Sequence, residues 1–273
     1  MQITRRELLA GIGAGTLGFG GLSLAQSRPR YSHYTYAADG DVDDRRVRVA
    51  WYERYNGAFQ ETHNGTTDPG FDSALEPDTA PAYIEEATYV TDVAGPVLTL
   101  GNTLPGDEGT LVVGLEVVDD GDFIAEPLDI WLRARLTGDS ENGINGSELS
   151  ANDTTATDGE LDDEVYVELW RDGAPLGSCN GEKNFLDSLE SPIVARSPMS
   201  IAFGPASDVG DDDGQRILNS IAPGQSRCVA LAWEFPQETA TNRSQGDSVS
   251  FEFVFVGVPA GSNSPFVTTE GTE

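Results

Sequence analysis

The sequence is poor in positive charge. Only 16 of its 273 residues are basic, against 46 acidic residues, and the single lysine is Lys183. A formal net charge of -30 repels itself strongly in dilute buffer, whereas molar salt shortens the screening length to about 3 Å. This composition indicates a protein of a halophile and argues against a nucleic-acid-binding face, which would be basic. The alternative is a merely acidic mesophilic protein.

Histidine is scarce as well, and this limits the chemistry that the chain can perform. His33 and His63 are its two histidines, and they do not have the His-Glu-x-x-His spacing of a zinc protease. A serine hydrolase would need one of the same two residues as its base. We therefore predict that the protein is not an enzyme.

Long apolar runs are missing beyond the N-terminus. Arg5 and Arg6 precede a glycine-rich apolar run over 8–24, and Ala25 follows as a small residue suited to signal peptidase. This pattern predicts a twin-arginine signal over residues 1–25, cleaved after Ala25, and therefore an extracellular or cell-surface protein. An ordinary Sec signal is the alternative. No later stretch reaches the roughly 20 apolar residues of a membrane-spanning helix, so we predict no membrane span in the mature chain.

Cysteine occurs only twice, as Cys179 and Cys228. In an exported protein such a pair predicts one disulfide, here closing a loop of about 50 residues that adds roughly 4 kcal/mol to stability in the chain-entropy model. Two free buried thiols are the alternative, because spacing does not show that the two side chains meet.

Alternation with a period of two dominates the rest of the chain. Apolar residues occupy every second position in six segments, which are 47–51, 111–117, 128–136, 165–169, 229–235 and 249–255. Strict alternation places one row of side chains on a core and the other toward solvent. We therefore predict an all-β fold over 45–258, a jelly-roll-like sandwich of two antiparallel sheets with long acidic loops.

Turn residues separate these segments. Asn56-Gly57 predicts a tight hairpin, and Pro105-Gly106 and Pro223-Gly224 each predict a turn just before a strand. One or two short helices are expected, with 82–87 and 184–190 as candidates. We also predict that residues 26–44 form an N-terminal arm and that 259–273 form a disordered polar tail.

A family resemblance rests on several stretches of the mature chain. They include a first strand, a Leu-Pro-Gly-Asp turn, an acidic loop, a strand with Trp and Asp near its end, and a last strand entry, at 47–57, 102–109, 140–143, 167–172 and 245–251. In this order they resemble the TasA/camelysin family of secreted fibre-forming proteins, here of haloarchaeal type. The resemblance implies a jelly-roll sandwich and a homo-oligomer or filament, in which a mature N-terminal strand enters the sheet of a neighbouring subunit.

The arm supplies a candidate donor strand, whose aromatic residues are Tyr31, Tyr34 and Tyr36. Aromatic residues are suited to such a strand because they favour β structure and fill pockets. Alternatively, the arm pairs within its own sandwich or is disordered. Many relatives use Sec signals, whereas a folded twin-arginine cargo must keep its sheet edge covered in transit. An arm that is first self-inserted and then exchanged after cleavage satisfies both requirements.

Acidic loops give candidate calcium ligands, and no other cofactor is expected. The densest cluster comprises Asp208, Asp211, Asp212 and Asp213. A looser one comprises Asp139, Glu141, Asn142, Asp158 and Glu160. Calcium binds six to eight such oxygens, although neither cluster has the spacing of a known calcium loop, and a solvated acidic surface is the alternative.

Four Asn-x-Ser/Thr sequons predict N-glycosylation of a surface protein, with chance as the alternative. They begin at Asn64, Asn145, Asn152 and Asn242. Taken together, the sequence predicts a secreted structural protein of the cell surface or biofilm matrix. The competing hypothesis is a monomeric binding module for glycans or another surface protein, with Trp131 and Trp170 as exposed stacking residues.

Overall fold

A computed structural model describes residues 31–37, 47–60, 87–90, 93–119, 126–173, 179–183, 190 and 192–266. The predicted signal peptide, with Arg5, Arg6 and the cleavage site after Ala25, lies outside these residues. So do Asn64, His63 and nearly all of both predicted helices.

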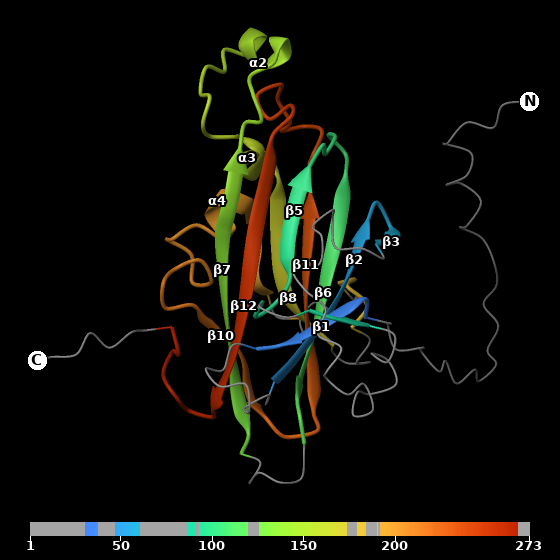
Figure 1. Cartoon of the computed structure of the whole chain (residues 1–273), viewed down its shortest axis with the longest axis vertical. Coiled ribbons are helices and arrows are strands. Elements are labelled where there is room, and N and C mark those ends of the chain that lie inside the picture. The colour runs from blue at the N-terminus through green and yellow to red at the C-terminus, as the bar shows by residue number, and fades with distance from the viewer. Residues whose placement is uncertain are drawn as a thin grey trace, which may run out of the picture.

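Two sheets face each other in a sandwich (Figure 1), which confirms the predicted fold class. The larger, eight-stranded sheet has the order β4-β1-β2-β6-β11-β8-β9, with β3 also paired to β2, and the smaller has the order β10-β7-β12-β5. The pairs are antiparallel except β1 with β4. The larger sheet comprises β1 (His33–Tyr36), β2 (Val47–Tyr55), β3 (Ala58–Gln60), β4 (Thr88–Tyr89), β6 (Glu108–Val117), β8 (Tyr166–Asp172), β9 (Pro192–Pro198) and β11 (Ser226–Glu234). The smaller comprises β5 (Val97–Gly101), β7 (Leu128–Ser140), β10 (Gln215–Ile221) and β12 (Ser248–Pro259).

The main core lies between the two sheets and follows the predicted alternation. All six predicted segments coincide, to within one residue at their ends, with strands or parts of strands, namely β2, β6, β7, β8, β11 and β12. Leu115 of β6 and Phe251 of β12 are both buried in this core. The neighbours of such residues along a strand point to the opposite face, because successive side chains of a strand alternate.

A second apolar cluster covers the outer face of the larger sheet. Its buried members are Tyr31, Tyr34, Ala50, Tyr52, Val112, Trp170 and Ala230. The sequence hypothesis of an exposed Trp170 is therefore wrong, since this side chain is only 1% exposed. Alternation correctly placed Trp170 opposite the main core, but segments distant in the sequence cover that outer face. Trp131 is half-buried.

The predicted turns are present and two of them contact each other. Asn56 and Gly57 both have positive φ, at 47° and 77°, as the tight hairpin between β2 and β3 requires. Gly106 has a φ of 99°, and the Asp107 carboxylate accepts hydrogen bonds from the Tyr55 hydroxyl at 2.5 Å and the Asn56 amide at 2.8 Å. Asp107 therefore joins the Leu-Pro-Gly-Asp turn to the first hairpin.

Three short helices occur among the described residues, and all lie outside the two predicted segments. They are α2 (Gly146–Ser150), α3 (Leu161–Glu164) and α4 (Met199–Ala202). No helix within the described ranges has the length and apolarity needed to cross a membrane.

The described part of the predicted tail contacts the sandwich. The Gly261 amide donates to Asp129, and the Phe266 ring lies 4.3 Å from the Arg133 guanidinium. Residues 267–273 lie outside the described chain.

The predicted disulfide joins Cys179 to Cys228, whose Cα atoms are 5.6 Å apart. It fastens the segment 179–183 over the outer-face cluster, because the Tyr52 hydroxyl donates to the Cys179 carbonyl at 2.9 Å. The Gly181 amide in turn donates to the Asp172 carboxylate at the end of β8, at 2.7 Å. The disulfide thus holds a cover on the outer face of the larger sheet.

Asp172 makes stability depend on pH. Its side chain is buried, and burial raises the pKa of Asp172 to about 6 from the ordinary 3.8. The folded state therefore binds more protons than the unfolded state between these values, and stability falls as pH rises from about 4 to about 6. We expect Asp172→Asn to weaken this fall and to gain up to about 3 kcal/mol at pH 7, at 1.36 kcal/mol per pKa unit. Urea unfolding from pH 4 to 7 measures the effect. The exposed Asp212→Asn is the control, and identical pH profiles for the wild type and Asp172→Asn would contradict the prediction.

Candidate functional site

The N-terminal strand occupies an edge of β2 within its own sheet. β1 pairs antiparallel with β2, in the register His33 with Trp51 through Tyr36 with Arg48, and parallel with β4. The Ala37 amide donates to the Val47 carbonyl at 2.9 Å, which closes the pairing at its end. Without β1, the backbone of β2 would therefore be unpaired along the edge where β1 now lies.

Side chains on both faces anchor β1. The His33 ring stacks on Trp51 at a centroid distance of 5.6 Å, and the Thr35 hydroxyl donates to the Val93 carbonyl at 2.9 Å. On the other face Tyr34 and Tyr36 contact each other and Tyr89. The ring centroids are 6.4 Å apart for Tyr34–Tyr36, 5.1 Å for Tyr34–Tyr89 and 6.0 Å for Tyr36–Tyr89. The predicted common face of Tyr34 and Tyr36 is confirmed.

Tyr31 extends this anchor across the outer face of the larger sheet. Its hydroxyl lies 3.5 Å from the Cys228 sulfur, and its ring lies 6.0 Å from that of Tyr52. A Cβ atom at Gly114 would lie only 2.2 Å from the Tyr31 hydroxyl oxygen, so a glycine at this position of β6 makes room for the tyrosine. The three predicted donor residues therefore all contact the chain's own larger sheet.

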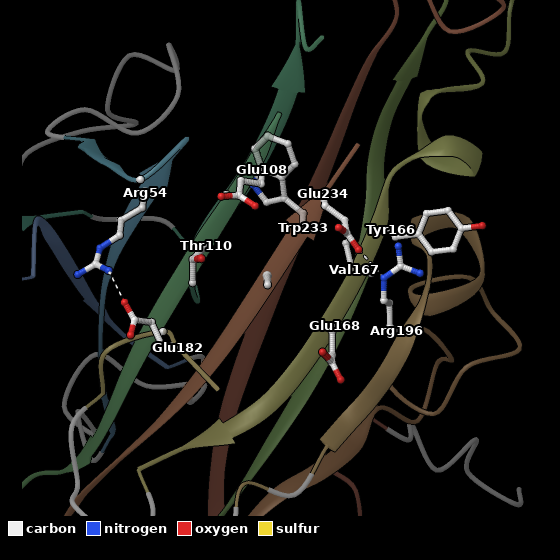
Figure 2. Close-up of a pocket in the computed structure, with 14 residues that line it drawn as sticks. Arg54, Glu108, Thr110, Tyr166, Val167, Glu168, Glu182, Arg196, Trp233 and Glu234 are labelled. Atoms are coloured by element: carbon white, nitrogen blue, oxygen red, sulfur yellow. Dashed lines mark hydrogen bonds and ion pairs between the residues drawn. The ribbon is translucent and has the colours of Figure 1, made fainter. Parts of the chain in front are cut away.

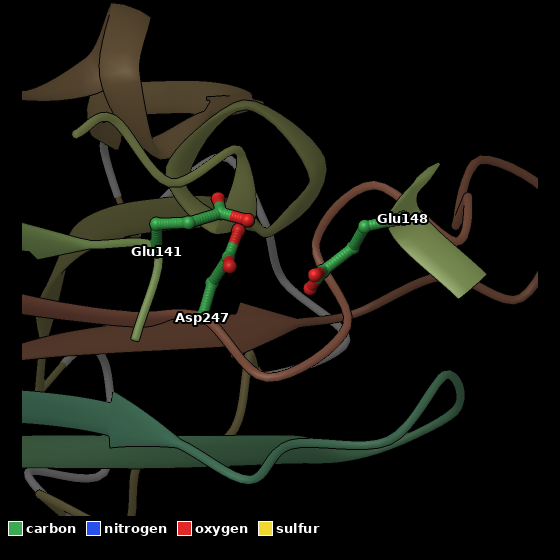
Figure 3. Close-up of side chains that lie close together, drawn as sticks. All are labelled: Glu141, Glu148 and Asp247. Carbon is green, nitrogen blue, oxygen red and sulfur yellow. The ribbon is translucent and has the colours of Figure 1, made fainter. Parts of the chain in front are cut away.

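A second candidate site is a cluster of carboxylates at one end of the sandwich. Glu141 follows β7, Glu148 lies in α2, Asp153 follows α2, Glu160 precedes α3 and Asp247 precedes β12. Four of the five side chains are buried, with Glu141 and Glu148 at 2% and 0% exposure. Figure 3 shows Glu141, Glu148 and Asp247 pointing toward one another. The cluster thus joins the ends of two neighbouring strands to the loop between β7 and β8.

Local sequence places these carboxylates. Asn145 caps α2 by accepting hydrogen bonds from the Ser147 and Glu148 amides, and the Glu148 side chain accepts in return from the Asn145 amide. This capping box holds Glu148 toward the cluster. The Asp247 carboxylate accepts from the Glu160 amide at 2.7 Å, which joins the entry of α3 to the entry of β12.

Burial and like charges set the protonation of the cluster. Burial, with the negative charges of Asp247 and Glu148, raises the pKa of Glu141 to about 7. Burial also raises the pKa of Asp247 to about 6, against the opposing effect of its bond from the Glu160 amide. In contrast, hydrogen bonds from the Thr155 amide and hydroxyl lower the pKa of Asp153. At neutral pH Asp153 and Asp247 are therefore ionised, whereas Glu141, with a pKa of about 7, is about half protonated.

The dense aspartate cluster predicted from sequence is arranged differently. Asp211 accepts from the amides of Asp213 and Gly214 in its own turn, and Asp212 pairs with Arg135. Asp208 is exposed. Within the described ranges, the carboxylate groups whose oxygens lie within 4.8 Å of one another are Glu141, Glu148 and Asp247, and Glu141, Asp153 and Glu160. Glu141 and Glu160 belong to the looser predicted cluster, whereas sequence reasoning missed Glu148, Asp153 and Asp247.

The described sequons occupy the loops at this end of the molecule. Asn152 and Asn242 are exposed, and Asn145 is half-buried. The Asn145 side chain also donates to the Gln245 carbonyl at 2.7 Å. Glycosylation at these positions stays a prediction.

A groove of about 380 Å³ crosses β2, β6, β11 and β8 on the larger sheet (Figure 2). Charged side chains line it and pair with each other: Arg196 binds Glu234, and Arg54 lies 3.9 Å from Glu182. The Arg196 guanidinium also covers the Tyr166 ring at 4.3 Å. Neither Trp131 nor Trp170 is among the residues that line this groove.

Comparison with known proteins gave no match to a family model and no match to a curated protein.

Proposed function

We propose that the protein is a secreted, non-catalytic structural protein of a halophile's cell surface or biofilm matrix. In this proposal it self-associates into filaments by exchanging β1 between subunits. The proposal rests on the position of β1. This short strand lies at the N-terminal end of the described chain and pairs along an edge of β2. The resemblance to the TasA/camelysin family gives the same mode of assembly.

Exchange needs little new chemistry. The contacts that hold β1 within one subunit, including the His33 stack on Trp51 and the ladder to β2, would be remade with a neighbour's strand. Swapping an identical element costs little for this reason, and a head-to-tail exchange that does not close on itself gives an open filament. The sequence 38–46, which links β1 to β2, contains Gly and Asp residues. A self-inserted arm also keeps the edge of β2 covered before assembly.

A cross-link between β1 and β2 tests the exchange. Thr35 and Val49 are register partners, and paired strands bring such residues within disulfide range. We expect the processed protein with Thr35→Cys and Val49→Cys, oxidised as the monomer, to remain monomeric in molar salt. The unmodified protein should form filaments under the same conditions. Sedimentation velocity and electron microscopy measure the difference.

The matched control locks a different pair of strands. Thr99 of β5 and Ser250 of β12 are also register partners, with their hydroxyl oxygens 3.0 Å apart. Thr99→Cys with Ser250→Cys should assemble like the unmodified protein, because this cross-link leaves β1 free to exchange. If the β1–β2 cross-linked protein forms filaments, assembly by strand exchange is contradicted. If the unmodified protein forms no filaments, the proposed structural function is contradicted.

The alternative function is a monomeric module that binds glycans or another surface protein. The groove over β2, β6, β11 and β8 supports it, since it offers both signs of charge on a rigid sheet. A ligand there would have to compete with the Arg196–Glu234 and Arg54–Glu182 pairs. Glycan-array binding by the β1–β2 locked monomer would favour this alternative.

A further inference from the structure

The carboxylate cluster of Glu141, Glu148, Asp153, Glu160 and Asp247 is poorly neutralised by the chain itself. An ion pair from Arg243 reaches one oxygen of Glu160 at 2.8 Å, and the Arg243 side chain is 47% exposed. Among the described residues, the other four carboxylates make no ion pair. Burying unpaired charges costs several kcal/mol per ion, and either protonation of the carboxylates or a bound cation offsets this cost.

Hydrogen bonds orient these carboxylates in a regular way. In four of them one oxygen accepts a hydrogen bond from the protein: Glu148 from the Asn145 amide, Asp153 from Thr155, Glu160 from Arg243 and Asp247 from the Glu160 amide. The second oxygen of each has no partner, and neither oxygen of Glu141 has one. The unpartnered buried oxygens are Glu141 Oε1 and Oε2, Glu148 Oε1, Asp153 Oδ2, Glu160 Oε2 and Asp247 Oδ1.

This arrangement is typical of metal-binding carboxylates, in which one oxygen binds the ion and a hydrogen bond to the other oxygen holds the side chain in place. Partners on the outer oxygens fix the orientation of coordinating carboxylates. The two groups that contain Glu141 each keep their ligand atoms within 4.8 Å of one another, and oxygens that bind one calcium ion at 2.3–2.6 Å lie at most about 5 Å apart. Glu141 belongs to both groups, so it is the centre of the cluster.

The donor atoms select the ion. All six are carboxylate oxygens, which favour hard cations over the zinc and copper ions that imidazole and thiolate bind. Magnesium keeps several of its water molecules and is seldom enclosed by protein ligands alone, whereas calcium accepts six to eight oxygens in flexible geometry. Unpartnered carboxylate oxygens that lie mostly on loop segments therefore fit calcium better than magnesium.

We propose that the protein binds calcium at this cluster, with Glu141 as the ligand shared by two carboxylate groups, one completed by Glu148 and Asp247 and the other by Asp153 and Glu160. The ion would fasten the loop that contains α2 and α3 to the ends of β7 and β12, at the end of the molecule where α2 projects (Figure 1). This inference does not depend on strand exchange.

Calorimetric titration with Ca²⁺ and with Mg²⁺, on chelator-treated full-length processed protein in molar NaCl, tests the proposal. We expect one ion to bind, or two that share Glu141, with Ca²⁺ at least tenfold tighter than Mg²⁺. Glu141→Gln should weaken Ca²⁺ binding by at least tenfold and abolish the rise in melting temperature on adding Ca²⁺. The metal-free variant should be no less stable than the metal-free wild type, because the change removes a buried charge.

The control variant is Asp212→Asn with Asp213→Asn, in the cluster that sequence density alone had favoured. Both side chains are exposed, and their replacement should leave Ca²⁺ binding unchanged. The proposal is overturned if the wild type shows no heat of binding at millimolar Ca²⁺, if Mg²⁺ binds equally well, or if Glu141→Gln binds like the wild type. Loss of binding in the control variant alone would place the site at the Asp208–Asp213 turn and would also overturn it.

Discussion

Replacing both cysteines, as Cys179→Ser with Cys228→Ala, is expected to lower the free energy of unfolding by about 4 kcal/mol. The disulfide closes a sequence separation of 49 residues, and without it the unfolded chain gains the corresponding loop entropy. Cys228 is buried, so alanine is used there to avoid burying a hydroxyl group. Urea unfolding at constant salt, followed by far-ultraviolet circular dichroism, measures the loss.

The structure adds a local effect to this global one. The segment 179–183 covers the outer-face cluster through the bonds Tyr52–Cys179 and Gly181–Asp172. Without the disulfide we expect this cover to open before the sandwich unfolds, since no covalent bond then ties it to β11. Reduced wild-type protein is the control and should unfold like the double variant. Agreement of both with the oxidised wild type to within about 1 kcal/mol would contradict the prediction, because the chain-entropy model gives about 4 kcal/mol for a loop of this span.

The strands and turns that could be predicted from the sequence are those encoded by local alternation and by turn residues. Six strands and the turns at Asn56-Gly57, Pro105-Gly106 and Pro223-Gly224 were found, because each is encoded within about ten residues by side-chain period or by backbone preference. The strands β9 and β10 lack such alternation and were missed. The helix α2 does carry a local sequence signal, the capping box formed by Asn145 and Glu148.

The carboxylate cluster could not be predicted in the same way. Asp247 lies 106 positions after Glu141 in the sequence, and only the pairing of β12 with β7 brings the two together. Local acidic density favoured the turn around Asp211, but there the carboxylate binds its own backbone amides. A high density of acidic residues along the chain therefore indicates an acidic surface. A buried carboxylate site depends instead on which strands are neighbours in the fold.

We expect Trp170→Ala to lower the free energy of unfolding by about 3–5 kcal/mol, the usual cost of truncating a large core side chain. Trp170 is 1% exposed within the outer-face cluster, and the Lys183 ammonium lies 5.8 Å from its ring. Replacing an exposed stacking residue by alanine would change the free energy of unfolding by no more than about 0.5 kcal/mol. Trp131→Ala is the matched control and should cost less than Trp170→Ala, because Trp131 is half-buried beside Arg216. Urea unfolding of the variants measures both losses.

Trp170→Phe separates packing from hydrogen bonding at the same position. The indole nitrogen of Trp170 has no hydrogen-bond partner. Replacement by phenylalanine therefore removes part of the apolar contact area but no hydrogen bond. We expect it to retain most of the stability that alanine loses. A Trp170→Ala variant as stable as the wild type would instead mean that the outer face of the larger sheet is open in solution. In that case Tyr31 and the disulfide segment would not cover it, and the tryptophan would again be available for stacking on a ligand.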